Sequence, residues 1–182
     1  VLFYYKQVLG LSGTLTGLAI AISVVWDAIS DPIVGAWSDK LRSRWGRRHP
    51  FMVASVVPMA LSFLALFAPP QFAVQTQQGL FLWLLGSVLL LRTALTFFMI
   101  PYLALGAEIT TDYHERTNLA SARTNLGWFA GITIAAGAML LLFADTQGQD
   151  GRFVTQNYHH YGWLNAVGVL VFSLICLKGT WH

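Results

Sequence analysis

The sequence predicts an all-α integral membrane protein, and three observations support this prediction. Hydrophobic residues make up 55% of the 182 residues and charged residues only 10%, whereas a soluble domain carries about 25% charged residues. Five segments are apolar over the roughly 20 residues that a helix needs to cross a bilayer. The connections between these segments also alternate in charge. This composition excludes a nucleic-acid-binding domain, a disulfide-rich secreted domain and a disordered chain.

Each predicted span is bounded by polar residues or proline. The basic run that begins at Asp39 ends the first span, and Pro69-Pro70 ends the second. A connection of mixed charge follows the third span, an acidic connection follows the fourth, and Lys178 marks the end of the fifth. The predicted spans cover residues 13–38, 50–68, 80–106, 120–143 and 160–178.

The charges of the connections predict the topology. The first connection holds five of the eleven Lys and Arg residues, and the second is uncharged. The third is mixed in sign, and the fourth has two aspartates against one arginine. Because basic loops stay on the cytoplasmic side, we expect loops 40–49 and 107–118 inside and loops 69–79 and 144–159 outside.

The residues before the first span form a short apolar and aromatic segment. Val1 to Tyr5 has the composition of the interfacial end of an outward-going helix, with Tyr4 and Tyr5 expected at the level of the lipid headgroups. We therefore expect the chain to be a fragment that begins in the last turns of a first helix and ends with a sixth.

Asp27 and Asp31 are the most informative residues, because both lie inside the first span. Their i, i+4 spacing places them on one helix face, roughly 18 and 12 Å from the cytoplasmic end at 1.5 Å per residue. Two carboxylates this close favour a shared proton or a cation between them. The structural alternative is that one aspartate caps a kink at Pro32 while the other is neutral and hydrogen-bonded to a neighbouring helix.

Arg92 is the other strongly charged residue deep in a span, about 21 Å from the cytoplasmic side. This depth is close to that of Asp27, so an ion pair between the two would offset both desolvation costs. Such a pair competes with a sodium site, and the alternative is an Arg92 that extends to an interface alone. Arg123, near the start of its span, is as readily structural as functional.

The remaining polar residues carry weaker signals. Thr124 and Trp128 could line a cavity, and Gly127 and Gly131 permit close helix packing. Neither a nucleophilic triad nor a phosphate-binding loop is present in the sequence, and the histidine and cysteine spacings match no metal site. We expect no cofactor, no nucleic-acid partner and no metal beyond a possible sodium ion at Asp27 and Asp31.

Two motifs resemble the glycoside–pentoside–hexuronide cation symporters of the major facilitator superfamily. The first motif is Trp26-Asp27-x-x-x-Asp31-Pro32-x-x-Gly35-x-x-x-Asp39-Lys40 followed by Arg42-x-Arg44-Trp45-Gly46-Arg47-Arg48-x-Pro50. The second motif is Ile100-Pro101-Tyr102-x-Ala104-Leu105-Gly106-Ala107-Glu108, continuing through Asp112-Tyr113-x-Glu115-Arg116-Thr117 to Arg123. The resemblance covers the whole chain and implies the N-terminal six-helix half of a twelve-helix transporter, truncated at helix 1.

The resemblance also implies roles for individual residues. Asp27 and Asp31 correspond to the sodium or proton site, and Arg123 to a sugar-binding arginine, whereas Met99 stands where the family has an acidic sugar ligand. The candidates for substrate contacts or charge pairs are Arg92, Thr96, Arg123, Thr124 and Trp128. The candidates for a conformational gate are Gly35, Asp39, Arg47, Arg48, Glu108 and Arg116.

The function expected from the resemblance is symport of a small polar solute, a sugar or glycoside, with a proton or sodium ion by alternating access. The expected partners are the solute, membrane lipid and the missing C-terminal half, and the expected location is the cell membrane, as a multi-pass protein of the bacterial inner membrane. The alternatives are a carrier of lipids or other amphiphiles with the same fold, a membrane-embedded enzyme, a receptor or a channel.

Overall fold

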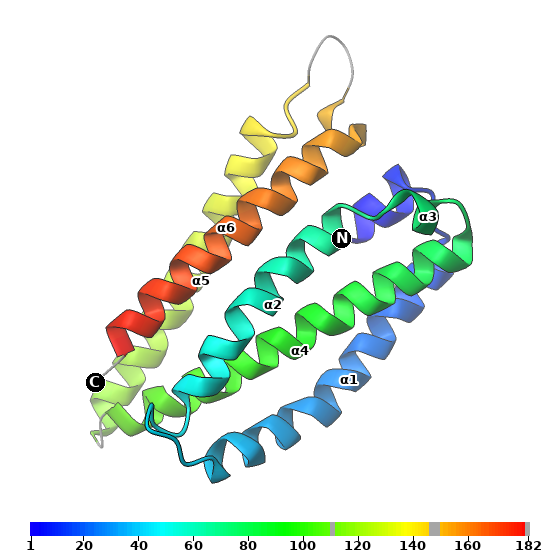
Figure 1. Cartoon of the computed structure of the whole chain (residues 1–182). Coiled ribbons are helices and arrows are strands. Elements are labelled where there is room, and N and C mark those ends of the chain that lie inside the picture. The colour runs from blue at the N-terminus through cyan, green and yellow to red at the C-terminus, as the bar shows by residue number, and fades with distance from the viewer. Residues whose placement is uncertain (110–111, 146–149, 181–182) are drawn as a thin grey trace.

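The computed structural model describes residues 1–109, 112–145 and 150–180, without the side chains of 107–109. Five long helices dominate it (Figure 1). They are α1 (Gly13–Lys40), α2 (His49–Phe67), α4 (Gln77–Ile109), α5 (Tyr113–Leu141) and α6 (Thr155–Thr180). The short elements are η1 (Tyr4–Val8), α3 (Gln71–Val74) and η2 (Gly151–Phe153). Each long helix is long and apolar enough to cross a membrane, which confirms the predicted all-α membrane class and the count of five spans.

The helices extend beyond several of the predicted spans. α5 begins at Tyr113 rather than 120, because the Asp112 carboxylate caps it by accepting a bond from the Glu115 amide at 3.0 Å. α6 begins at Thr155 rather than 160. The expected loop 107–118 is therefore helical at both ends in the described part of the chain. Hydropathy locates the apolar middle of a span, whereas the helix continues into polar residues until a cap ends it.

α4 is the central element of the bundle. It packs against α1 on one side and α2 on the other, and α2 also packs against α6 (Figure 1). One apolar cluster joins η1 to α2, α4 and α6 near the end where α3 lies, around Tyr4, Tyr5, Leu66, Leu84 and Tyr158. A second cluster joins α2, α4 and α6 toward the other end, around Met52, Val56, Met59, Phe98 and Leu177. The two clusters fix α4 against its neighbours.

Tyr4 and Tyr5 are fully buried against other parts of the chain. Their expected position at the level of the lipid headgroups stays a prediction. The Tyr5 hydroxyl donates to the Leu66 carbonyl at 2.9 Å, and the Tyr4 ring stacks on Tyr158 at a centroid distance of 4.3 Å. Composition cannot distinguish an interfacial tyrosine from a buried one whose hydroxyl binds a helix-end carbonyl.

α5 lies apart from the packed core. None of its residues is buried, and within the described residues its main contact is with α4. A Cβ atom added at Gly127 or Gly131 would meet nothing within 4 Å. The close packing expected at these glycines is therefore not made by any described part of the chain.

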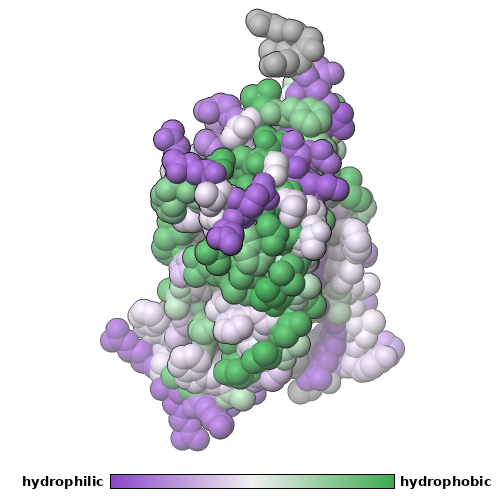
Figure 2. All heavy atoms as spheres, turned by 90° about the vertical axis from the view of Figure 1, so that its right-hand side faces the viewer, coloured by the Kyte–Doolittle hydropathy of each residue, from purple (hydrophilic) through white to green (hydrophobic). Residues whose placement is uncertain are grey.

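The connections segregate to the two ends of the bundle as the charge pattern requires. The α1–α2 connection, the start of α5 and the end of α6 lie at one end, and η1, α3 and the start of α6 lie at the other (Figure 1). Hydrophobic residues predominate between two more hydrophilic ends (Figure 2). His49 Nε2 lies 3.0 Å from the Thr180 carbonyl oxygen, which joins the start of α2 to the end of α6.

Candidate functional site

Four polar side chains form two contacts between the middles of α1 and α4. Because each helix presents its pair at i, i+4 spacing, the pairs lie at matching heights. Arg92 Nη1 forms an ion pair with Asp27 Oδ2, and Thr96 Oγ1 donates to Asp31 Oδ1 at 2.8 Å. We call Asp27, Asp31, Arg92 and Thr96 the α1–α4 polar cluster. The ion pair predicted from the depths of Asp27 and Arg92 is thereby confirmed.

Trp26 and Thr93 add a third link beside the cluster. The indole Nε1 of Trp26 donates to Thr93 Oγ1 at 2.9 Å, and Thr93 Oγ1 in turn donates to the Leu89 carbonyl at 2.7 Å. No role was predicted for Thr93 from the sequence. Thr93 directly follows Arg92 and precedes Thr96 by three residues, and this spacing could have predicted its place near the cluster.

Two buried side-chain oxygens of α1 have no hydrogen-bond partner among the described residues. Among the residues that the structure describes, Asp27 Oδ1 and Ser30 Oγ are buried without a hydrogen-bond partner. A buried polar group without a partner is costly, so a water molecule bound to either oxygen would stabilise the site. Ser30 is a second residue for which no role was predicted from the sequence.

The charges of the cluster do not balance. The Arg92 guanidinium neutralises Asp27, whereas Asp31 is bonded to the uncharged Thr96 hydroxyl. A lone carboxylate at this depth costs about 2.5–3.5 kcal/mol on the insertion scale. Binding a positive charge at Asp31 is therefore the change that lowers the free energy of the cluster most.

Asp27 and Asp31 are the two carboxylates of the α1–α4 polar cluster. Among the side chains that the structure describes, no group of three or more His, Cys, Asp or Glu could hold a metal ion. One oxygen of Asp27 is already occupied by a guanidinium. The resemblance implied a sodium ion or a proton at these aspartates, and the identity of the cation stays a prediction.

The candidates on α5 lie away from the polar cluster. Arg123 lines a separate cavity of about 420 Å³ with Tyr102 and Arg116, between the adjoining ends of α4 and α5 and the end of α6. The Thr124 hydroxyl donates to the Ala120 carbonyl of its own helix at 2.9 Å, and Trp128 is 70% exposed. The structure thus brings Arg92 and Thr96 to the aspartates, but not these three residues.

The gate candidates lie at the end of the bundle that holds the α1–α2 connection. Arg48 Nη2 lies 3.3 Å from Asp39 Oδ1, which links the two ends of this connection. A Cβ atom at Gly35 would meet Ile100 Cγ2 at 3.6 Å, an ordinary contact, so α4 passes close but does not require glycine. Arg47 lies beside Arg48. The side chain of Glu108 lies outside the described residues.

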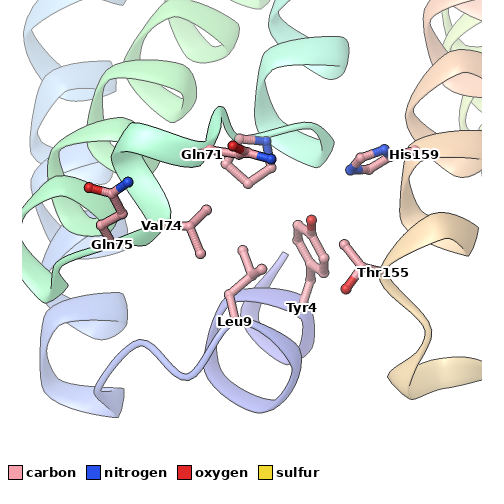
Figure 3. A pocket seen from close by; sticks show the side chains of 8 residues that line it. Tyr4, Leu9, Gln71, Val74, Gln75, Thr155 and His159 are labelled. Carbon is pink, nitrogen blue, oxygen red and sulfur yellow. The ribbon is translucent and has the colours of Figure 1, made fainter.

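A second cavity, of about 500 Å³, opens at the opposite end. Figure 3 shows Tyr4, Thr155, His159 and Gln71 gathered around one side of it, with Gln75 at the far side. None of its lining residues belongs to the polar cluster. Nearby, Arg152 binds both carboxylate oxygens of Asp150, and these bonds hold the pKa of Asp150 below its ordinary value.

Comparison with known proteins yields several related symporters. An uncharacterized symporter of Synechocystis sp. is 39% identical over 126 residues, which cover 68% of this chain and 23% of that protein. The glucuronide carrier protein homolog of Escherichia coli is 27% identical over 188 residues, which cover 99% of this chain and 38% of that protein. The sodium-dependent lysophosphatidylcholine symporter 1-A of Danio rerio is 31% identical over 108 residues, which cover 59% of this chain and 20% of that protein.

The chain spans less than two fifths of the length of each of these relatives. A family model described as MFS/sugar transport protein matches residues 1–181. This match covers almost the whole chain and agrees with the five apolar helices of a multi-pass membrane protein. The resemblance seen in the two sequence motifs is confirmed: the chain belongs to the MFS/sugar transport protein family, a family of transporters rather than enzymes.

Proposed function

We propose that this chain is the cation-coupling part of a secondary transporter that moves a sugar or glycoside together with a proton or a sodium ion. The α1–α4 polar cluster carries the proposal. It has two carboxylates and one guanidinium at the middle of two spans, where ionisable residues are costly and usually functional. The names of the relatives, two symporters and a glucuronide carrier homolog, support it.

The proposed mechanism is alternating access. This chain would rock against the remaining part of a full-length transporter around a site near the membrane midplane. A cation bound at Asp31 would remove the unbalanced charge of the cluster and so favour the rearrangement that carries it across. The Arg48–Asp39 ion pair would close the cytoplasmic end in one state and open in the other.

Arg123 is our candidate for contact with the solute. It lies ten residues into α5, about 15 Å along the helix from Tyr113. The cavity that it lines with Arg116 and Tyr102 has the guanidinium groups that bind carboxylates in a two-pronged manner. This chemistry suits a sugar acid such as a glucuronide better than an uncharged sugar.

The test is counterflow in vesicles that contain the full-length protein. A labelled methyl glucuronide should exchange with saturation, and unlabelled glucuronide should compete with it. A channel would not saturate, and an enzyme would change the solute chemically. Exchange without saturation, or no glycoside exchange at all, contradicts the proposal.

A lipid carrier with the same fold is the second candidate function. One relative is named as a lysophosphatidylcholine symporter and is 31% identical over 108 residues. In the counterflow assay, competition by lysophosphatidylcholine together with no competition by glycosides would favour this function.

A further inference from the structure

We infer that Arg92 determines which cation the site accepts: its guanidinium occupies the position of a metal ion beside Asp27 and thereby excludes sodium. This inference rests on the proposed cation-coupled function, because it names the cation that the same site rejects. The observation behind it is the direct ion pair between Arg92 Nη1 and Asp27 Oδ2.

The oxygen of Asp27 that is not bonded to Arg92 lies close to a fixed positive charge. Asp31 Oδ1 is taken by the Thr96 hydroxyl, and Asp27 Oδ2 by Arg92. Among the described residues, Asp27 Oδ1 and Ser30 Oγ are the buried side-chain atoms without a partner. A sodium ion bound to Asp27 Oδ1 would lie next to the guanidinium that shares the same carboxylate.

Displacing Arg92 to admit sodium is also unfavourable. A guanidinium cannot lose its proton in a protein, so a displaced Arg92 would remain a charge without a partner. It lies at the middle of α4, more than about 20 Å from either end of the helix at 1.5 Å per residue. The Arg92 guanidinium can neither leave the site nor lose its charge, unlike a sodium ion, which exchanges. Only the charge of Asp31 is then available for coupling.

The ion pair could instead serve only to hold α1 against α4. The two roles predict different results when the charge of Arg92 is removed. If Arg92 is purely structural, removing its charge weakens the contact between α1 and α4 and creates no binding site for sodium. An arginine that replaces an ion leaves the Asp27 carboxylate facing a vacated position that sodium can fill.

The experiment measures sodium binding rather than transport, so it remains valid if the proposed solute is wrong. The full-length protein in detergent is compared in sodium chloride and in choline chloride of equal ionic strength, through its melting temperature and its tryptophan fluorescence. Trp26, one of the seven tryptophans of this chain, lies close to the site because its indole is bonded to Thr93, next to Arg92. The variants are Arg92→Gln, Arg92→Lys as the charge-retaining control, and Asp27→Asn with Arg92→Gln.

We expect no sodium-specific change in the unmodified protein or in Arg92→Lys. Arg92→Gln should gain one, with sodium affinity raised at least about 100-fold, because unit charges about 5 Å apart repel that strongly at an effective dielectric constant of about 20. The double variant should lose the gained response, since it lacks the Asp27 carboxylate.

Two results would overturn the inference. One is a sodium-specific response of the unmodified protein, which needs no variant to be observed. The other is an Arg92→Gln protein that is folded by circular dichroism and does not respond to sodium. If Arg92→Gln does not fold, Arg92→Ser takes its place, because its smaller side chain leaves room for water beside Asp27. A failed transport assay with the sodium results as expected would contradict only the proposed function.

Discussion

Asp27 and Arg92 lie at the middle of two membrane spans, and each makes the other tolerable there. Asp27 has 23% of its side chain exposed and Arg92 39%, so the pair is partly rather than fully enclosed. A lone charge at this depth costs several kcal/mol. The pair offsets both costs only while both partners are present, since a buried ion pair that loses one member leaves an uncompensated charge.

A double-mutant cycle on this pair is the first prediction. Asp27→Asn or Arg92→Gln alone should lower the free energy of unfolding of the full-length protein by about 1–3 kcal/mol, because each leaves a polar group without its partner. The double variant should be more stable than the sum of the two losses indicates, with a coupling energy of about 0.5–3 kcal/mol. Thermal denaturation in detergent measures all four proteins.

The control for the cycle is Thr124→Val on α5, whose hydroxyl donates to a carbonyl of its own helix. It should be additive with either change, since it lies away from the pair. Additive losses for Asp27→Asn and Arg92→Gln would show that the two residues do not stabilise each other.

How much of the site could be predicted from the sequence depends on the kind of side chain. Charged residues are rare in apolar segments, which made Asp27, Asp31 and Arg92 conspicuous. The similar depths of Asp27 and Arg92 were enough to predict their ion pair. Ser30 and Thr93 carry little hydropathy signal, and their roles depend on the relative rotation of α1 and α4. The burial of Tyr4 and Tyr5 could not be predicted, because burial depends on which distant segments cover a residue.

At the scale of the element, α6 shows how one glycine sets a helix contact. A Cβ atom at Gly162 would lie 2.9 Å from Phe67 Cβ and 3.5 Å from the Phe63 carbonyl oxygen. A contact below 3 Å would force α2 and α6 apart. Phe67 Cβ lies next to the backbone and cannot turn away as the end of a flexible side chain can. Gly168, on the same helix, has open space at the corresponding point.

The second prediction compares these two glycines. Gly162→Ala should destabilise the protein by about 1–3 kcal/mol through overpacking between α2 and α6. Gly168→Ala should be neutral or stabilising, since alanine is the better helix former by about 1 kcal/mol. The measurement is the melting temperature of the two variants side by side. Equal effects of the two changes would contradict the packing of α6 on α2.

The number of long helices was predictable from the sequence, whereas their ends were not. Apolar runs of about 20 residues have few alternatives to a membrane helix, so five spans were found correctly. The starts of α5 and α6 depend on capping and on turns in polar sequence, where hydropathy has no contrast. The isolation of α5 was also unpredicted, since its apolar residues look the same whether they face protein or lipid.

At the scale of the whole molecule, the topology has a direct test, which is the third prediction. Ser43 lies in the basic α1–α2 connection and Gln75 at the opposite end, next to α3. After Cys176→Ser removes the one cysteine of this chain, Gln75→Cys should react with an impermeant thiol reagent in intact cells and Ser43→Cys should not. Permeabilised cells provide the control, since both should then react. Labelling of Ser43→Cys but not Gln75→Cys in intact cells would show that the protein has the opposite orientation.

The fourth prediction concerns coupling by the full-length protein. Asp31 holds the unbalanced charge of the cluster, while the charge of Asp27 is already matched by Arg92. Asp31→Asn removes the charge that a cation would neutralise, but asparagine can still accept the bond from Thr96, so the helix contact should survive. We therefore expect uphill uptake to be lost while downhill exchange of the solute persists.

Two comparisons make this prediction specific. Thr96→Val removes the hydroxyl that donates to Asp31 and leaves the carboxylate, so uphill uptake should weaken without disappearing. In the unmodified protein, uptake should respond to an imposed pH gradient at constant sodium and not to a sodium gradient at constant pH, because Arg92 leaves no place for the metal ion. Unchanged uphill uptake by Asp31→Asn would remove this carboxylate from the mechanism. Uptake driven by sodium alone would instead place the coupling ion beside Asp27 and require Arg92 to move away from it during transport.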